Sequence, residues 1–111
     1  MERINPMIIN VGDKEYTLEF NRKTAKMAEL GGFKRDDVDD KLMTRIPELF
    51  YYAFKMHHPN ITKEKTDEIL FESLEGLTQK ELDRLAALYS APYKTLINES
   101  GERKNGTVTV K

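Results

Sequence analysis

Residues 7–20 read MIINVGDKEYTLEF, in which two apolar stretches flank Gly12 and Asp13. Glycine adopts positive φ without a steric penalty, so this dipeptide suits a two-residue turn between antiparallel strands. Such a turn places Ile9 opposite Tyr16, and alternation along each strand then separates an apolar face from a polar one. The predicted apolar face holds Met7, Ile9, Tyr16, Leu18 and Phe20, and the predicted polar face holds Glu15, Thr17 and Glu19.

The rest of the chain predicts four short helices, which makes the fold mainly α (α+β) with an N-terminal hairpin. The predicted ranges are 5–20 for the hairpin and about 22–30, 44–57, 63–74 and 79–98 for the helices. A chain of 111 residues is about long enough to form one hydrophobic core, so these elements are assigned to a single domain over residues 1–98. Residues 99–111 have little to bury and predict a flexible tail, in which TVTV (107–110) can add to a sheet edge on binding.

Helix ends are marked by residues that satisfy or interrupt the backbone hydrogen bonds. Thr78 and Glu81 have the spacing of a reciprocal capping box. Pro92 lacks an N–H, which predicts a kink or break near Ser90. Gly31 is suited to ending the first helix. The expected N-caps are Asn21, Thr44, Thr62 and Thr78.

Composition excludes several classes of protein. The chain is 39% hydrophobic and 33% charged, and it has no apolar run long enough to cross a bilayer. The absence of cysteine excludes disulfides and thiolate sites. A net charge of −1 gives no field that would concentrate the chain on nucleic acid. We therefore expect a soluble, cytosolic protein that binds neither membranes nor nucleic acid.

The two histidines of the chain, His57 and His58, are adjacent in sequence. Helical spacing from Ile46 reaches His57, so that this residue continues the apolar stripe of its helix, while His58 points about a quarter turn away. Histidines that share a metal on a helix are usually four residues apart, so a metal site here would need irregular backbone and distant carboxylates. The alternative is a helix C-terminus at which both imidazoles bond the last carbonyl groups.

No motif in the sequence predicts catalysis. It lacks a glycine-rich phosphate loop, a nucleophile elbow and a helical histidine pair, so we expect no enzymatic activity, no cofactor and no metal. The segment DDVDD (36–40) lacks the central glycine and the terminal glutamate of a calcium loop, which favours a solvated connector. Residues 62–89 resemble a helix-turn-helix in outline, but Glu81 and Asp83 lie where base-reading donors are needed.

Several large apolar residues fall outside or at the margins of the predicted helical stripes. One interpretation is that the helix over 44–57 is central and buried on most sides. The other is an exposed apolar patch, which on a soluble domain usually marks a partner surface, and methionine and tyrosine suit adaptable contacts. The candidate partner-binding residues are Tyr51, Tyr52, Met56, Phe71 and Leu88.

Three segments carry a resemblance to a known family. They are KEYTLEFNRKTAKMAELGGF (14–33), MTRIPELFYYAFKMHHPNIT (43–62) and ELDRLAALYSAPYKTLI (81–97), and PELFYYAFKMHH is the most specific part. The chain resembles the tail assembly chaperones of siphoviruses and prophages of Gram-positive hosts over roughly residues 8–98. The resemblance implies a mostly helical, non-enzymatic protein of the host bacterial cytoplasm that is absent from the finished virion.

The resemblance also implies partners. Such chaperones are thought to bind the helical tape measure protein, keep it soluble and bring tail tube subunits to it, in some systems through a longer form made by frameshifting. A homo-oligomer would raise avidity, and we expect the hairpin to supply an edge for self-association or to dock on a neighbouring copy. The alternative is a small phage-encoded regulatory protein that binds DNA or a host protein.

Overall fold

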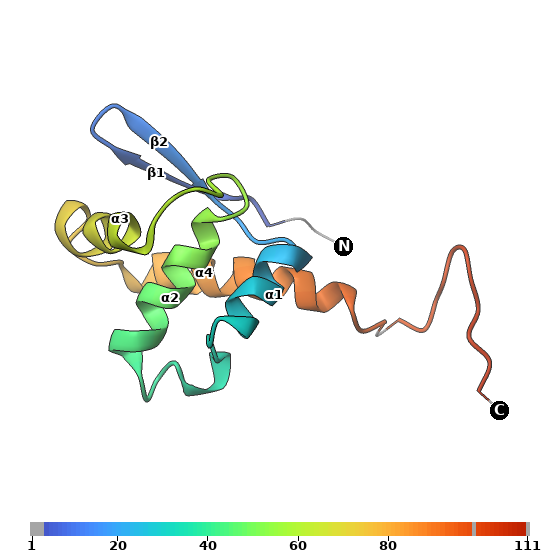
Figure 1. The fold of residues 1–111 in the computed structure, drawn as a ribbon. Helices are drawn as coiled ribbons and strands as arrows, with labels where there is room; N and C mark the ends of the chain where they lie inside the picture. Colours follow the sequence, from blue (N-terminus) through green and yellow to red (C-terminus); the bar gives the residue numbers. More distant parts are fainter. Residues whose placement is uncertain (1–3, 99, 111) are drawn as a thin grey trace.

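A computed structural model describes residues 4–98 and 100–110. The described part consists of a two-stranded antiparallel hairpin followed by four α-helices, which confirms the predicted fold class (Figure 1). Short 3₁₀ or π turns extend or connect the helices. The elements are β1 Met7–Val11, β2 Lys14–Leu18, α1 Arg22–Leu30, η1 Arg35–Asp37, α2 Leu42–Phe54, α3 Lys63–Glu68, η2 Ile69–Ser73, α4 Gln79–Ser90 and η3 Ala91–Thr95.

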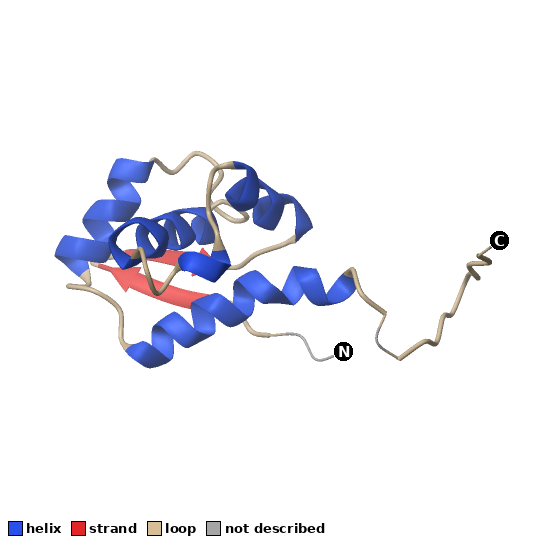
Figure 2. Ribbon diagram, turned by 90° about the horizontal axis from the view of Figure 1, so that it is seen from below, coloured by secondary structure: helices blue, strands red, loops and turns tan. Residues whose placement is uncertain are grey.

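The hairpin has the predicted register, with Ile9 opposite Tyr16 and Gly12 in the turn at φ 63°. Its apolar face is buried against the helices, which lie on one side of the strands (Figures 1 and 2). The prediction was wrong for Glu19, which was placed on the solvated face but is only 8% exposed. Glu19 follows the end of β2, where the chain runs against the C-terminus of α2.

The C-terminus of α2 closes the outer edge of β2. The Glu19 N–H donates to the Ala53 carbonyl at 3.0 Å, and the Thr17 N–H donates to His58 Nε2 at 3.0 Å. His57 Nε2 lies 2.9 Å from a Glu19 carboxylate oxygen. The expectation that His57 continues the apolar stripe was wrong: α2 ends at Phe54, and the exposed His57 side chain contacts the Glu19 carboxylate instead of the core.

The predicted N-caps are confirmed at three of the four helices. The Asn21 side chain accepts from the Thr24 N–H, and Thr24 returns a bond to the Asn21 N–H, which completes a capping box. Thr78 and Glu81 form the predicted box at α4, with bonds of 2.8 and 3.1 Å. Thr62 accepts from the Lys65 N–H at α3. These bonds satisfy first-turn amides that have no partner inside the helix.

The second helix begins earlier than predicted. Its first residue is Leu42 and its N-cap position is Lys41, so Thr44 lies inside the helix and does not cap it. Pro47 is therefore in the second turn, and its ring is buried. The prediction began the helix at Thr44 because a proline is tolerated in the first turn of a helix. The structure instead tolerates Pro47 one turn further on, where its apolar ring is buried.

The last two helices are interrupted near their C-termini. After Glu68 the third helix continues as the π turn η2, in which the Leu74 N–H reaches back to the Ile69 carbonyl. The helix predicted over 79–98 ends at Ser90 and continues only as the 3₁₀ helix η3 to Thr95. The predicted break near Ser90 is thus confirmed, since Pro92 has no N–H to donate to Leu88.

The core lies between the hairpin and the packed faces of α1, α2 and α4. The residues whose side chains are almost fully enclosed include Leu18, Ala28, Phe50, Phe54, Ile69 and Leu85. Phe50 and Phe54 meet edge to face with centroids 5.0 Å apart, and Tyr16 meets Phe54 at 5.5 Å. The contact between Tyr16 and Phe54 packs β2 of the hairpin against α2, and the burial of these rings is favourable because it removes apolar surface from water.

Residues 100–110 are exposed and form neither helix nor strand. They leave the domain on the side away from the hairpin turn, as both ribbon views show (Figures 1 and 2). The flexibility predicted for 99–111 stays a prediction, and residues 99 and 111 of that segment lie outside the described residues. Within the described part of the chain, no helix has the length and apolar character needed to span a membrane.

Candidate functional site

Tyr51 and Tyr52 lie next to one another on α2, and both are half-buried. Their rings meet edge to face with centroids 4.9 Å apart, and the Lys55 ammonium lies 4.8 Å from the centre of the Tyr51 ring. Burial raises the pKa of the Tyr52 hydroxyl, and the charges of Tyr51 and Glu48 raise it further. The pair is therefore held in place while part of each ring still faces solvent.

Tyr52 connects α2 to the last turn of α1. A Cβ atom at Gly31 would overlap the Tyr52 hydroxyl and would lie 3.1 Å from the Met27 carbonyl oxygen. Glycine at this position is what allows the hydroxyl to reach the helix backbone. Met27 and Leu30 are exposed on the same turn, Leu30 by 75%. Met56 lies in the turn that follows α2 and is half-buried.

Partly exposed apolar side chains lie on α1, on the C-terminal part of α2 and in the turn after it, and Tyr52 meets α1 at Gly31. We name this set the α1–α2 surface, and it comprises Met27, Leu30, Tyr51, Tyr52 and Met56. The sequence predicted three of its members and missed the two on α1. Spacing held a signal for these two, because Met27 and Leu30 are three residues apart and so lie on one face of their helix.

The other two predicted residues lie elsewhere. Phe71 is on η2 and is 48% exposed. Leu88 is only 2% exposed and belongs to the core, so its assignment to a partner surface was wrong. The buried residues of α4 are Leu85, Leu88 and Tyr89, whereas Ala86 is exposed.

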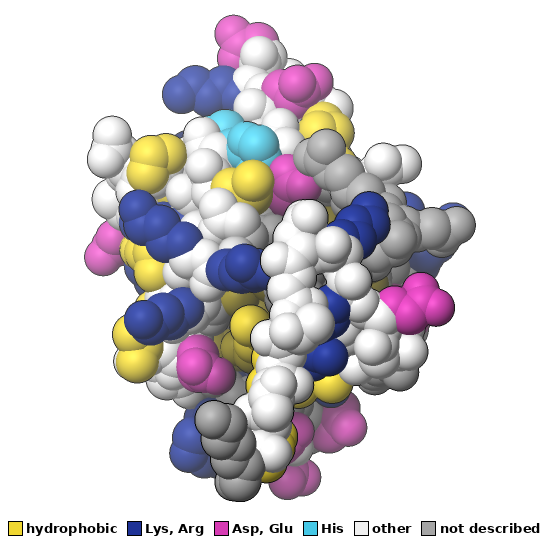
Figure 3. Space-filling view, turned by 90° about the vertical axis from the view of Figure 1, so that its right-hand side faces the viewer, with side chains coloured by type: hydrophobic (Ala, Val, Ile, Leu, Met, Phe, Trp, Pro, Cys, Tyr) yellow, Lys and Arg dark blue, Asp and Glu magenta, His cyan; other side chains and the backbone are white. Residues whose placement is uncertain are grey.

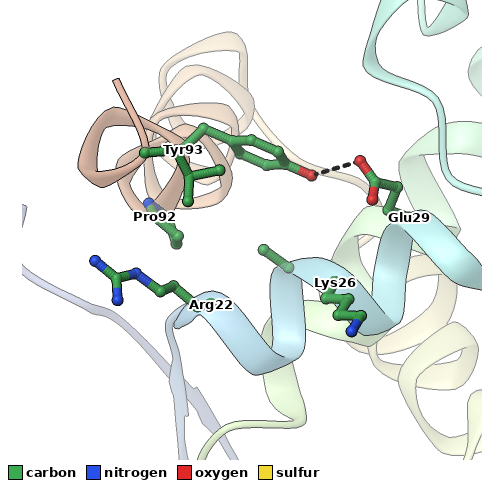
Figure 4. A pocket seen from close by; sticks show the side chains of 7 residues that line it. Arg22, Lys26, Glu29, Pro92 and Tyr93 are labelled. Atoms are coloured by element: carbon green, nitrogen blue, oxygen red, sulfur yellow. Dashed lines mark hydrogen bonds between the residues drawn. The ribbon is translucent and has the colours of Figure 1, made fainter. Parts of the chain in front are cut away.

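A second apolar feature is a pocket between α1 and η3, with a volume of about 270 Å³ (Figure 4). We name it the α1–η3 pocket. Arg22 and Lys26 extend from α1 at its rim, and the Pro92 ring lies across from them (Figure 4). The residues that line it are Arg22, Ala25, Lys26, Glu29, Pro92, Tyr93 and Leu96.

Hydrogen bonds hold the two walls of the α1–η3 pocket together. The Tyr93 hydroxyl donates to a Glu29 carboxylate oxygen at 3.2 Å (Figure 4), and the Arg22 guanidinium donates to the Thr95 hydroxyl at 2.9 Å. The Tyr89 and Tyr93 hydroxyls are 2.9 Å apart. Burial raises the pKa of Tyr89, and its bond to Tyr93 raises it further, so this phenol stays neutral.

The mouth of the α1–η3 pocket combines apolar and basic groups. Leu96 is 65% exposed and Ile97 follows it, also exposed. Arg22 and Lys26 supply positive charge, and Glu29, which accepts from Tyr93, supplies one negative charge. On the face from which the C-terminal segment projects, hydrophobic side chains show between lysine and arginine side chains (Figure 3). Such a site can accept an apolar side chain whose neighbours carry carboxylates. The sequence offered one signal for it, the helix break predicted at Pro92.

A cluster of charged residues near the connector has a structural role. Arg45 donates to Asp37 at 2.7 Å, to Glu48 at 2.7 Å and to the Gly32 carbonyl at 2.8 Å. The hydrogen bond from Arg45 lowers the pKa of Asp37. The segment DDVDD is therefore tied to α2 through Asp37. Among the described residues no three His, Cys, Asp or Glu side chains are grouped to hold a metal ion.

Comparison with curated proteins and with solved structures gave no match. A family model described as a domain of unknown function (DUF5055) matches residues 4–111. The match includes the hairpin, all the helices and the exposed C-terminal segment. Because it covers nearly the whole chain, the chain belongs to the DUF5055 family.

Proposed function

We propose that this protein is a tail assembly chaperone of a siphophage or prophage of a Gram-positive host. In this role it binds the tape measure protein in the host cytoplasm, keeps it soluble and helps to recruit tail tube subunits, without entering the finished virion. It acts by covering apolar surface and performs no catalysis. The observation that carries the proposal is that α1 is flanked by two partly exposed apolar sites, the α1–α2 surface and the α1–η3 pocket.

The two sites lie on either side of α1 because only one face of this helix is buried. Thr24, Ala25 and Ala28 face the core, so both flanks of the helix remain near solvent. One flank carries Met27 and Leu30, and the other lines the pocket. A nine-residue helix thus serves two apolar sites on a domain of modest size.

These sites suit a long amphipathic helix as partner. An apolar side chain of such a helix fills the α1–η3 pocket, and acidic residues on neighbouring turns meet Arg22 and Lys26. The flexible side chains of methionine and the broad faces of tyrosine adapt to many similar segments. Each contact is weak alone, so several copies on one tape measure raise the affinity through effective concentration.

Recruitment of tube subunits requires a second contact. In this proposal it comes from a longer, frameshifted form that carries an additional domain, or from other copies in a homo-oligomer. A short form in excess would then mask the tape measure, while the longer form brings the tube protein.

The test is co-expression with the tape measure protein of the same genome, scoring the solubility of that protein and its co-purification with this chain. Leu96→Asp changes the pocket mouth and Tyr51→Ser changes the α1–α2 surface. The matched control is Met43→Ser, since Met43 is 82% exposed on the first turn of α2 and belongs to neither site. All four proteins are first compared by thermal unfolding.

The proposal expects a soluble tape measure that co-purifies with the wild type and with Met43→Ser. Leu96→Asp should weaken co-purification while leaving the unfolding temperature unchanged. Tyr51→Ser should also weaken co-purification, and because it removes the ring contact with Tyr52 it is compared at a temperature at which the variant is still folded. Loss of binding with all three variants would contradict the assignment of the sites. A tape measure that stays insoluble beside both short and frameshifted forms would sink the proposal, and binding of DNA or a host protein instead would favour a regulatory role.

A further inference from the structure

The two strands of the hairpin differ in how their outer edges are satisfied. Along β2 the outward N–H groups of Thr17 and Glu19 bond to His58 and Ala53. Because Ile8 is opposite Thr17 and Asn10 is opposite Glu15, the backbone groups of Ile8 and Asn10 point out from the other edge. β1 therefore carries the open edge of the hairpin.

Strand β1 itself carries none of the residues or bulges that usually block the pairing of an edge. β1 reads MIINV, with no charged residue, no proline and no bulge, and the Ile8 side chain is half exposed. Exposed edges of this kind are templates for an additional strand. A groove runs beside it. Pro6, Met7 and Ile8 line one side, and α4 lines the other with Ala87 and with charged side chains, among them Lys80 and Arg84.

The chain also contains an unpaired segment that suits a strand. Thr107–Val110 reads TVTV, in which β-branched residues of alternating polarity favour an extended strand with one apolar face. Val108 and Val110 are 71% and 92% exposed, with no apolar neighbour to cover them. The segment falls within the DUF5055 match, so it belongs to the unit that defines the family.

We propose that Thr107–Val110 of a second copy adds to the open edge of β1 as an antiparallel third strand. In the register that fits, Thr109 lies opposite Ile8 and Thr107 opposite Asn10, and each pair exchanges two backbone hydrogen bonds. Val108 then lies beside Ile9, and Val110 beside Met7, on the face that adjoins the groove. The alternation of the segment thus matches the alternation of β1.

The direction of the tail favours a second copy over the tail of the same chain. Residues 100–110 leave the domain on the side away from the hairpin turn, so pairing within one chain needs a reversal of direction (Figures 1 and 2). Reciprocal exchange of tails between two copies closes the assembly as a dimer and raises the affinity of each short strand. This inference does not depend on the function proposed above.

The experiment compares amide hydrogen exchange at Ile8 and Asn10 in the full chain and in two variants, together with molar mass in solution. Thr109→Pro removes a backbone donor of the added strand. Asn105→Pro is the matched control, because it lies in the same exposed segment outside the paired residues. Neither position touches the core, so both variants fold.

The wild type and Asn105→Pro should be dimers in which both amides exchange slowly, and Thr109→Pro should be a monomer in which they exchange fast. The amides of Ile8 and Asn10 exchange only while the edge of β1 is unpaired. Their exchange rates should therefore fall about tenfold once about nine-tenths of the β1 edges are paired, and they should fall further as the protein concentration rises. Equal, fast exchange in all three proteins would overturn the pairing. Protection in a monomer, independent of concentration, would overturn the exchange between copies.

Discussion

Replacing His58 with phenylalanine tests how the hairpin is fastened to α2. The Thr17 N–H is always a donor, so His58 Nε2 must accept and its imidazole must be neutral. Phenylalanine keeps a ring against Tyr16, whose centroid is 5.3 Å from that of His58, but removes the acceptor. One hydrogen bond of this kind contributes about 0.5–1.5 kcal/mol, so His58→Phe should lower the free energy of unfolding by about 1 kcal/mol at neutral pH.

The same contact predicts a dependence on pH. Burial lowers the pKa of His58, and the charge of His57 lowers it further, from an ordinary value of 6.5. The unfolded chain therefore binds a proton at His58 more readily than the folded chain does. The stabilisation is complete above pH 6.5 and is lost as the pH falls below that value through the folded pKa.

Denaturant unfolding at about pH 7.5 and at about pH 5 measures both effects. The difference in unfolding free energy between the wild type and His58→Phe should shrink at the lower pH, where the wild type has lost its own acceptor. His57→Phe is the control, because it removes the Glu19 contact but leaves the Thr17 bond. It should keep most of the His58-dependent fall in stability, since burial, the larger cause of the lowered His58 pKa, remains. A wild-type advantage over His58→Phe that stays constant between the two pH values would refute the neutral acceptor.

Four further single substitutions test the packing and the helix cap described above. Gly31→Ala should displace the Tyr52 ring and lower the free energy of unfolding by about 1–3 kcal/mol. A second change, Tyr52→Leu, should recover part of this loss, whereas unchanged Tyr52 signals in NMR spectra of Gly31→Ala would contradict the close approach. Thr78→Ala should cost about 1 kcal/mol in denaturant unfolding through loss of the cap, and an unaltered midpoint would argue against the capping box. Leu88→Ala should lower the free energy of unfolding by about 2–5 kcal/mol, because Leu88 is in the core. Phe71→Ala should change it by no more than about 0.5 kcal/mol, because Phe71 is half exposed, and equal changes in calorimetry would contradict these assignments.

Local signals in the sequence predicted much of the fold. Gly12 set the hairpin register, and the capping boxes and the break before Pro92 depend on neighbours within four residues. Pro47 was misjudged because its ring is buried inside the fold, and a local rule for helix starts does not include burial. The position of Glu19 failed for the same reason, since only the approach of α2 explains its burial.

The candidate sites were less predictable because they form between distant segments. The sequence indicated Tyr51, Tyr52 and Met56 from their excess over one helical stripe, but their proximity to α1 depends on Gly31. The α1–η3 pocket joins residues about seventy positions apart, such as Arg22 and Thr95 in their hydrogen bond. No periodicity within one element reports a contact of that kind.

The separation of these two walls sets the order in which binding competence arises during synthesis. The hairpin and α1 leave the ribosome first, but α1 gains its second wall only after Pro92 and Tyr93 have emerged. Long-range closure of this kind is slow relative to local helix formation. A nascent chain that ends at Ser90 would thus carry the hairpin and helices without the pocket, so a partner that recognises the pocket engages finished molecules alone. Crosslinking of such a partner to chains stalled before and after residue 96 would separate the two cases.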